Sequence, residues 1–154
     1  MPDSPRLEVD VVKVVRAPVP PSFVRSVLAR TASLPEVAAR LPEGTSRIAV
    51  RITGDRELRR LNKTYAGNDS VTDVLSFAGS GDHLGDLAIS WETVVCQAAD
   101  FKHAPASELA LLCVHGMLHL LGWDHAAGSE RKEMVRITIA ALELSNVRLP
   151  AGRL

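Results

Sequence analysis

The chain contains no long run of apolar residues and very little cysteine. None of its apolar runs approaches the roughly 20 residues of a membrane-spanning helix, and residues 1–10 lack the apolar stretch of a secretory signal peptide. The two cysteines, Cys96 and Cys113, each lie in an apolar, helix-like stretch. We therefore expect two reduced thiols in the core of a cytoplasmic protein that does not contact a membrane, and nothing in the sequence requires a disulfide.

Net charge and aromatic residues are scarce as well. The 18 basic residues balance the 18 acidic residues, so the chain as a whole has no electrostatic attraction to nucleic acid. Three Phe, two Trp and one Tyr offer few rings for stacking on bases, which argues against sequence-specific reading of RNA. With 154 residues, 46% hydrophobic and 23% charged, the composition predicts one globular domain over residues 1–154.

Histidine is concentrated in one short segment. Three of the five histidines lie within the eleven residues His115-Gly-Met-Leu-His119-Leu-Leu-Gly-Trp-Asp-His125. On a helix, positions four apart differ by only about 40° around the axis, so His115 and His119 would share one face. Glycine readily takes the left-handed conformation that ends a helix, and Gly122 is therefore predicted to turn the chain so that His125 approaches the first two.

This spacing predicts a metal site with three ligands, His115, His119 and His125, and one position left for water, as in catalytic zinc sites. We expect one Zn²⁺ per chain, while three imidazoles also suit nickel, copper and iron. A purely structural zinc usually has four ligands rich in cysteine, and no cysteine pair with that spacing is present. Without the third histidine, the pair would be interpreted as two ordinary histidines, one buried and one exposed.

The three histidines resemble the metzincin protease pattern, His-Glu-x-x-His-x-x-Gly-x-x-His, in their offsets. Gly116 stands where that pattern has the glutamate that activates water. A glycine cannot accept a proton, so peptide hydrolysis by the metzincin mechanism is disfavoured, although a metal ion could still activate water. Gly116 could instead serve packing, by letting another part of the chain approach the helix.

Read in full, the segment 115–125 resembles the signature of the YbeY family, bacterial metal-dependent endoribonucleases of ribosomal RNA maturation. Thr72-Asp-Val-Leu-Ser-Phe77 and Leu84-Gly-Asp-Leu-Ala-Ile-Ser90 resemble two strands of that family, and Leu61-Asn-Lys-Thr-Tyr65 adds a further match, so the resemblance spans residues 48–144. It implies a single-domain metallohydrolase that cuts single-stranded RNA, ribosomal RNA in particular. It also implies the ribosome or small-subunit assembly components as partners. Binding to DNA is not expected.

The chain departs from the family in one segment. The family usually has Tyr-Arg-x-Lys-Asp where this chain has Tyr65-Ala66-Gly67-Asn68-Asp69. Both basic residues are therefore missing, and the arginine is regarded as a phosphate-binding or catalytic group in relatives. Either a neighbouring arginine replaces it, or this member cleaves weakly or differently.

A basic face is predicted on the helix 56–65, with Asp55 as its N-cap. Four basic residues fall within about 100° of one another on a helical projection, opposite Leu58, Leu61 and Tyr65. These four residues are Arg56, Arg59, Arg60 and Lys63. A solvated surface face is the ordinary interpretation, whereas the family resemblance favours a stripe that binds RNA phosphates.

His115 and Asp124 are the candidate catalytic residues. Asp124 is adjacent to the third predicted ligand, where its carboxylate could hydrogen-bond a histidine, bind the metal directly or cap the turn. We favour the first and the last of these roles.

Other polar residues are given structural roles. For Asp73 and Asp86, hydrogen bonding at a turn or strand end is favoured over catalysis. His83 and His103 lie in polar connections and are expected to be exposed, and Trp123 is expected to pack beneath the turn.

The pattern of apolar residues predicts an α+β fold, a single domain in which a small mixed four-stranded sheet packs against about five helices. The predicted strands are 7–15, 46–53, 73–77 and 84–90, the last two forming a hairpin; the predicted helices are about 22–33, with Ser22 as cap, 56–65, 91–101, 106–121 and 129–144. Residues 145–154 are expected to be a frayed tail.

A metal-dependent endoribonuclease is the leading hypothesis for the function of this chain. Its rivals are a metalloprotease-like or other small metallohydrolase, and a non-catalytic ribosome-assembly factor with a structural metal.

Overall fold

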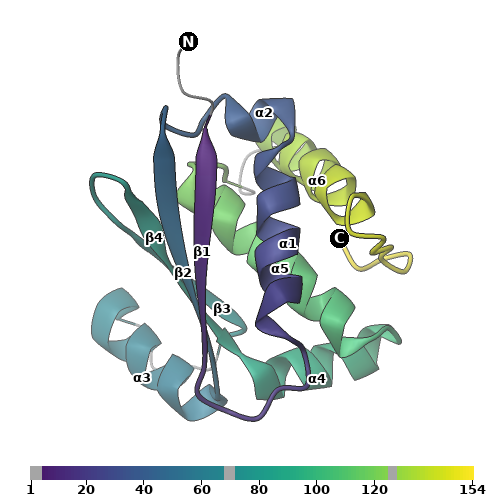
Figure 1. Ribbon diagram of the computed structural model, residues 1–154. Helices are drawn as coiled ribbons and strands as arrows, with labels where there is room; N and C mark the ends of the chain where they lie inside the picture. The colour runs from purple at the N-terminus through teal and green to yellow at the C-terminus, as the bar shows by residue number, and fades with distance from the viewer. Residues whose placement is uncertain (1–4, 68–71, 125–127) are drawn as a thin grey trace.

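The computed structural model describes residues 5–67, 72–124 and 128–154. These residues form one four-stranded sheet and six helices (Figure 1). The strands are β1 (Arg6–Lys13), β2 (Thr45–Thr53), β3 (Val74–Ala78) and β4 (His83–Ser90). The helices are α1 (Pro21–Ala32), α2 (Pro35–Ala38), α3 (Asp55–Ala66), α4 (Trp91–Phe101), α5 (Pro105–Leu120) and α6 (Gly128–Glu143).

The sheet has the strand order β1-β2-β4-β3. β1, β2 and β4 are parallel, and β3 is antiparallel to β4, which makes it the edge strand of a hairpin. Crossovers that contain helices join the parallel strands, as parallel pairing requires. The predicted α+β fold with a small mixed sheet is therefore confirmed.

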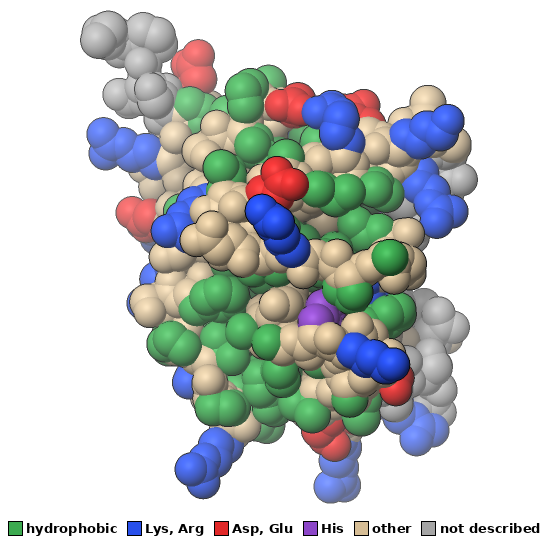
Figure 2. Space-filling view, turned by 90° about the vertical axis from the view of Figure 1, so that its right-hand side faces the viewer, with side chains coloured by type: hydrophobic (Ala, Val, Ile, Leu, Met, Phe, Trp, Pro, Cys, Tyr) green, Lys and Arg blue, Asp and Glu red, His purple; other side chains and the backbone are tan. Residues whose placement is uncertain are grey.

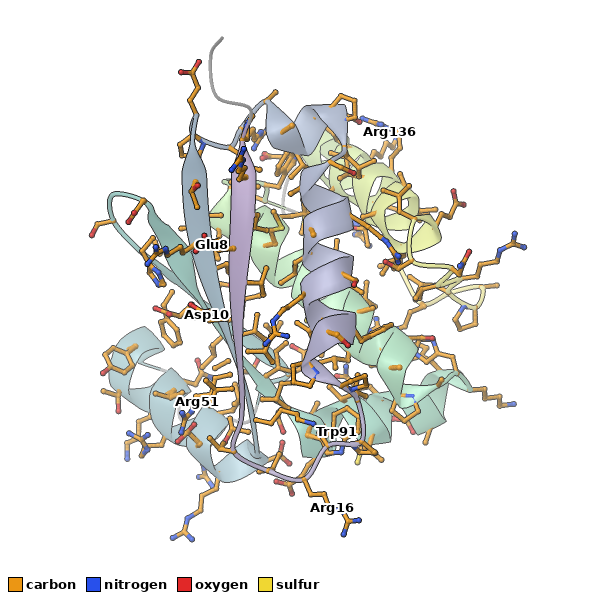
Figure 3. The ribbon with its side chains drawn as sticks, viewed as in Figure 1. Glu8, Asp10, Arg16, Arg51, Trp91 and Arg136 are labelled. Atoms are coloured by element: carbon orange, nitrogen blue, oxygen red, sulfur yellow. The ribbon has the colours of Figure 1, made fainter. Side chains whose placement is uncertain are left out.

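The two faces of the sheet are covered by different helices. Alternate residues of β2, among them Ile48, Val50 and Ile52, are fully buried on the inner face, where α1 and α5 pack. The outer face carries charged residues such as Glu8, Asp10 and Arg51, and α3 lies on this side (Figure 3). One face is therefore a packed core, and the other is covered mainly by a single amphipathic helix.

Helix α5 lies at the centre of the core. Its residues 108–114 and 116–118 are all buried, because it packs against the sheet on one side and against α1, α4 and α6 on the others. Such a helix is held rigidly by close packing. The half-buried His115 and His119 are therefore carried on a helix that is buried along most of its length.

Several predicted element boundaries agree with the structure within one or two residues, and α4 matches its prediction. The sixth helix is the four-residue α2, which the prediction did not count. Two predicted caps are wrong. Ser22 lies inside α1, whose N-cap is Pro20, and Asp55 is the first residue of α3, whose N-cap is Gly54.

The predicted frayed tail is also wrong. Residues 145–154 have no regular secondary structure, but they fold back onto the helices, with Val147 buried and Leu149 packed against the core. The prediction of two core thiols holds for Cys113, which is buried, and fails for Cys96, which is exposed; both are free. No helix in the described ranges has the length and apolar character needed to cross a membrane.

Candidate functional site

The turn after α5 forms as the sequence predicted. Gly122 has φ +94°, a conformation that favours glycine. The Trp123 N–H donates to the Leu118 carbonyl at 3.0 Å, and the Gly122 N–H donates to the His119 carbonyl at 3.0 Å. These two bonds form a Schellman motif, which satisfies the last carbonyls of the helix and reverses the chain.

The buried side chain of Trp123 stabilises this turn. The side chain is 2% exposed, and the Arg40 guanidinium lies 3.6 Å from the centroid of its ring. Arg40 also donates to the Leu121 carbonyl at 3.2 Å, and the Trp123 Nε1–H donates to Glu133 Oε1 at 3.2 Å. The predicted packing role of Trp123 is therefore confirmed.

The two described histidines of the motif line one cleft of about 490 Å³. It lies between β3, α5, α6 and the C-terminal segment. Its walls contain Asp73, Val74, Ser76, Leu112, His115, His119, Arg131, Met134, Val135, Arg153 and Leu154. Figure 2 shows histidine atoms in a recess of the molecule, bordered by hydrophobic side chains and by Lys or Arg.

A single stripe of α5 points towards this cleft. Leu112, His115 and His119 are separated by three and four residues and all line it, so they occupy one face of the helix, as predicted for the histidine pair. Glu108, one turn earlier, continues the stripe into the interior, where it is fully buried.

Gly116 allows α5 to approach the sheet. A Cβ atom at this position would lie 2.6 Å from Cδ2 of Leu87, on β4. The Gly116 carbonyl accepts a hydrogen bond from the Ser76 hydroxyl of β3 at 3.4 Å. The packing role considered for Gly116 is therefore the one that the structure supports, and it places His115 directly beside β3.

Two predicted site residues lie at or beyond the limit of the described chain. His125, the third predicted ligand, lies outside the described residues and stays a prediction. Asp124 is exposed, and its backbone N–H donates to Glu130 Oε1 at 3.1 Å. Its carboxylate does not line the cleft in the described structure, so the turn role is supported and a catalytic role stays untested.

Asp73 and Asp86 have different surroundings. Asp73 lines the cleft, where Oδ1 accepts from the Val74 N–H at 2.8 Å and Oδ2 accepts from Gln97 Nε2 at 3.3 Å. Asp86 is exposed on the outer face of the sheet and lies 3.1 Å from the His83 ring nitrogen. Strand-end hydrogen bonding is thus observed for Asp73, directly before β3, whereas Asp86 lies inside β4 and contacts His83 of the same strand. Only Asp73 lines the cleft.

A buried carboxylate beneath the cleft was missed by the sequence analysis. Glu108 accepts hydrogen bonds from Gln97 Nε2 at 2.8 Å, from His103 Nε2 at 2.7 Å and from Arg153 Nε at 2.9 Å. Gln97 also bonds Asp73, so the network links two charged cleft residues, Asp73 and Arg153, to one buried anchor. The only sequence signal was an acidic residue in an otherwise apolar helical run.

These contacts overturn the expectation that His103 is exposed, since its side chain is 8% exposed. They also set the ionisation of Glu108. Burial alone raises the pKa of Glu108, but the hydrogen bonds from Arg153, His103 and Gln97 outweigh it and hold the pKa below its ordinary value. Glu108 is therefore a carboxylate at neutral pH.

The predicted basic face is remote from the cleft. None of the four residues lines the cleft, because α3 packs on the outer side of the sheet and the cleft opens on the inner side. Arg60 pairs with Glu57 at 3.6 Å, and Tyr65 stacks edge-on with Phe77 of β3 at 5.5 Å between centroids. The RNA-binding role of Arg56, Arg59, Arg60 and Lys63 stays a prediction.

The donor set fits a divalent transition metal as far as it is described. His115 and His119 present two imidazoles on successive turns of a rigid helix to the same cleft, which suits zinc. Within residues 5–67, 72–124 and 128–154, no group of three ligating side chains occurs. Completion of the site would therefore need a ligand such as His125 from outside these ranges.

Fold and site together define the class as an α+β protein with a histidine pair on a buried helix beside an open cleft. The sequence profile of the Endoribonuclease YbeY family matches residues 20–145. Endoribonuclease YbeY of Roseiflexus castenholzii is 44% identical over 133 residues, which cover 79% of this chain and 80% of the relative. Endoribonuclease YbeY of Chloroflexus aggregans is 44% identical over 123 residues, covering 72% and 80% of the two chains.

The chain therefore belongs to the Endoribonuclease YbeY family. The family resemblance expected from the sequence is confirmed, and so is the expected class, a family of enzymes that hydrolyse RNA. The solution structure of TM1509 from Thermotoga maritima has a TM-score of 0.62 and 19% identity, and covers 90% of this chain and 92% of that one. That likeness supports the fold alone.

Proposed function

We propose that this chain is a metal-dependent endoribonuclease that cuts single-stranded RNA in the cleft beside His115 and His119. The observation that carries the proposal is the placement of both imidazoles in one open cleft. Membership of the Endoribonuclease YbeY family supplies the reaction class. Ribosomal RNA as the substrate, action in the cytoplasm and contact with ribosomal assembly components are parts of the same proposal.

We propose His115, His119 and His125 as the ligands of one divalent ion, zinc in the first instance. When bound, such an ion polarises a phosphodiester oxygen and activates water. The rigidity of α5 would hold two of the ligands in a fixed geometry, because the helix is buried on the sides that face the sheet and the neighbouring helices.

The chain's own residues shape the rest of the cleft. Leu112, Met134 and Val135 give it apolar walls, which would exclude water and pack against ribose or base. Asp73 keeps lone pairs beyond those used by Val74 and Gln97, so its carboxylate can accept a proton or a hydrogen bond from the RNA 2′-hydroxyl.

The test compares cleavage by the wild type, His115→Ala and the matched control His83→Ala on a short unstructured RNA. Loss of a ligand should lower kcat/KM by more than about a hundredfold. Even mutation of a residue that only hydrogen-bonds a metal ligand lowers metal affinity or activity by about 10–100-fold. His83→Ala should cut like the wild type, because His83 lies on the outer face near Asp86. Metal analysis should give about one ion per wild-type chain and less for His115→Ala. Equal cleavage by all three proteins would overturn the proposal.

The same proteins separate the rival functions. A metalloprotease would digest casein in a chelator-sensitive manner and leave RNA intact. A factor with a structural metal would unfold when His115 is replaced, whereas the proposed enzyme should keep its circular dichroism spectrum and lose only cleavage.

A further inference from the structure

An arginine of α6 faces the histidine cleft. Arg131 lies in the first turn of α6, is exposed, and lines the same cleft as His115 and His119. Met134 and Val135, three and four residues further on, line this cleft as well, so this face of α6 is directed towards it.

The acidic neighbours of Arg131 on α6 are engaged elsewhere. Glu130 Oε1 accepts from the Asp124 N–H at 3.1 Å, and Glu133 Oε1 accepts from Trp123 Nε1 at 3.2 Å. Both carboxylates therefore bind the turn that follows α5. Arg131 itself has no hydrogen bond or ion pair with any residue in the described parts of the chain.

The other arginine of the cleft, Arg153, already has an acidic partner. Arg153 is paired with the fully buried Glu108, and its guanidinium lies 4.4 Å from the centroid of the Phe101 ring. Its charge is therefore neutralised and its donors are largely occupied. Asp73 adds a negative charge to the same cleft, which leaves Arg131 as the cation available to an anionic ligand.

We propose that Arg131 binds a phosphate group of the RNA strand in the histidine cleft. The inference rests on the proposed function and deepens it by naming a residue that positions the substrate. A guanidinium offers paired, coplanar N–H donors that match two phosphate oxygens. Because Arg131 and the two histidines line one cleft, a phosphate held by Arg131 fixes where the strand lies relative to the imidazoles.

The test uses full-length wild type, Arg131→Ala, Arg131→Lys and the control Lys132→Ala. Lys132 is the adjacent exposed cation on α6 and does not line the cleft in the described structure. Binding of a short fluorescein-labelled single-stranded RNA is measured by anisotropy across a salt series, with chelator present so that the RNA is not cut. Cleavage kinetics without chelator give KM and kcat separately.

Arg131→Ala should weaken binding roughly tenfold at low salt, the size expected for a charged hydrogen bond. The slope of log K against log salt should fall by about 0.7, the value for one phosphate contact on a single strand. KM should rise while kcat changes less than about twofold, because the contact forms in the ground state. Arg131→Lys should retain the salt slope with intermediate affinity, and Lys132→Ala should bind within about twofold of the wild type.

Equal affinities and salt slopes for Arg131→Ala and Lys132→Ala would overturn this inference, even when the wild type cuts RNA normally. A wild type that binds RNA without cutting it would overturn the proposed reaction, and the same comparison of affinities would still decide the role of Arg131. A wild type that neither binds nor cuts RNA would overturn both.

Discussion

Two glutamate–arginine pairs, one on each side of the sheet, differ mainly in burial. On the inner side, Glu108 of α5 is fully buried with Arg153, whose side chain is 13% exposed. On the outer side, Glu57 of α3 pairs with Arg51 of β2, with side chains 24% and 46% exposed (Figure 3). The same chemical pairing is thus part of a packed interior in one case and of a hydrated surface in the other.

The pKa values of both glutamates are lowered, but the largest influence on the pKa differs between the two residues. For Glu57, the hydrogen bond from Arg51 is the largest cause and it lowers the pKa directly. For Glu108, burial is the largest cause and raises the pKa, and the hydrogen bonds must overcome it. The buried pair is therefore the one in which removal of a partner leaves an uncompensated group away from water.

The largest effect should come from Glu108→Ala. This change removes the ion-pair partner of Arg153 and leaves the His103 and Gln97 donors without their acceptor. The free energy of unfolding should therefore fall by about 3 kcal/mol. Glu57→Ala should cost less than about 1 kcal/mol, because water replaces an exposed partner. Urea unfolding of the two variants measures the difference, and equal losses would show that burial does not distinguish the pairs.

A second difference between the faces lies in how closely a helix approaches the sheet. Gly116→Ala should lower the free energy of unfolding by about 1–3 kcal/mol, because its Cβ would overlap the Leu87 side chain in a packed core. The better helix propensity of alanine, worth up to about 1 kcal/mol, works in the opposite direction. Gly128→Ala is the matched control, since a Cβ there meets no atom of the described residues within 4 Å, and it should change stability by less than about 0.5 kcal/mol.

A double-mutant cycle sharpens this prediction. In a Leu87→Ala background the obstructing methyl groups are absent, so Gly116→Ala should become neutral or stabilising. An unchanged cost of Gly116→Ala in that background would mean that a contact other than the one with Leu87 requires the glycine.

Acid should destabilise the inner network through Glu108. Since its pKa in the folded state is held below the ordinary value near 4.5, its pairing contributes stability fully above pH 4.5, and that stability is lost as the pH falls through the folded-state pKa. Glu108→Gln should therefore unfold with a shallower dependence of melting temperature on pH below about 4.5 than the wild type. Parallel curves for the two proteins would contradict the assignment of Glu108 as a folded-state carboxylate.

The features that sequence reasoning predicted correctly depend on short-range rules. Gly122 ends α5 because helix termination is decided within a few residues, and the β3–β4 hairpin follows from a short turn between two apolar strands. The placement of His115 and His119 on one face follows from helical geometry alone. These local rules were enough to find the two described histidines of the site.

The features that were missed depend on residues far apart in the chain. Asp55 obeys the local rule for an N-cap, but its carboxylate instead accepts bonds from Ser90 and Thr93, and Glu92 accepts the Asp55 backbone N–H at 3.0 Å. Arg153 meets Glu108 across 45 residues. No local pattern marks either arrangement, since both are created when α4 and the C-terminal segment pack.

The smallest expected effect concerns the exposed cations of α3 on the outer side of the sheet. The double variant Arg56→Ala/Lys63→Ala should weaken RNA binding by about threefold at low salt, since exposed ionic contacts are worth up to about 1 kcal/mol and are screened by salt. Its kcat should be unchanged, because α3 and the cleft lie on opposite sides of the sheet.

The double variant Arg25→Ala/Lys102→Ala removes the same charge from other exposed positions and serves as its control. A larger loss of affinity in the α3 variant than in this control would mean that the strand continues past the β3 edge onto α3, as the basic face predicts. Equal losses would mean that α3 contributes only its share of the overall charge, and that binding depends on the inner cleft.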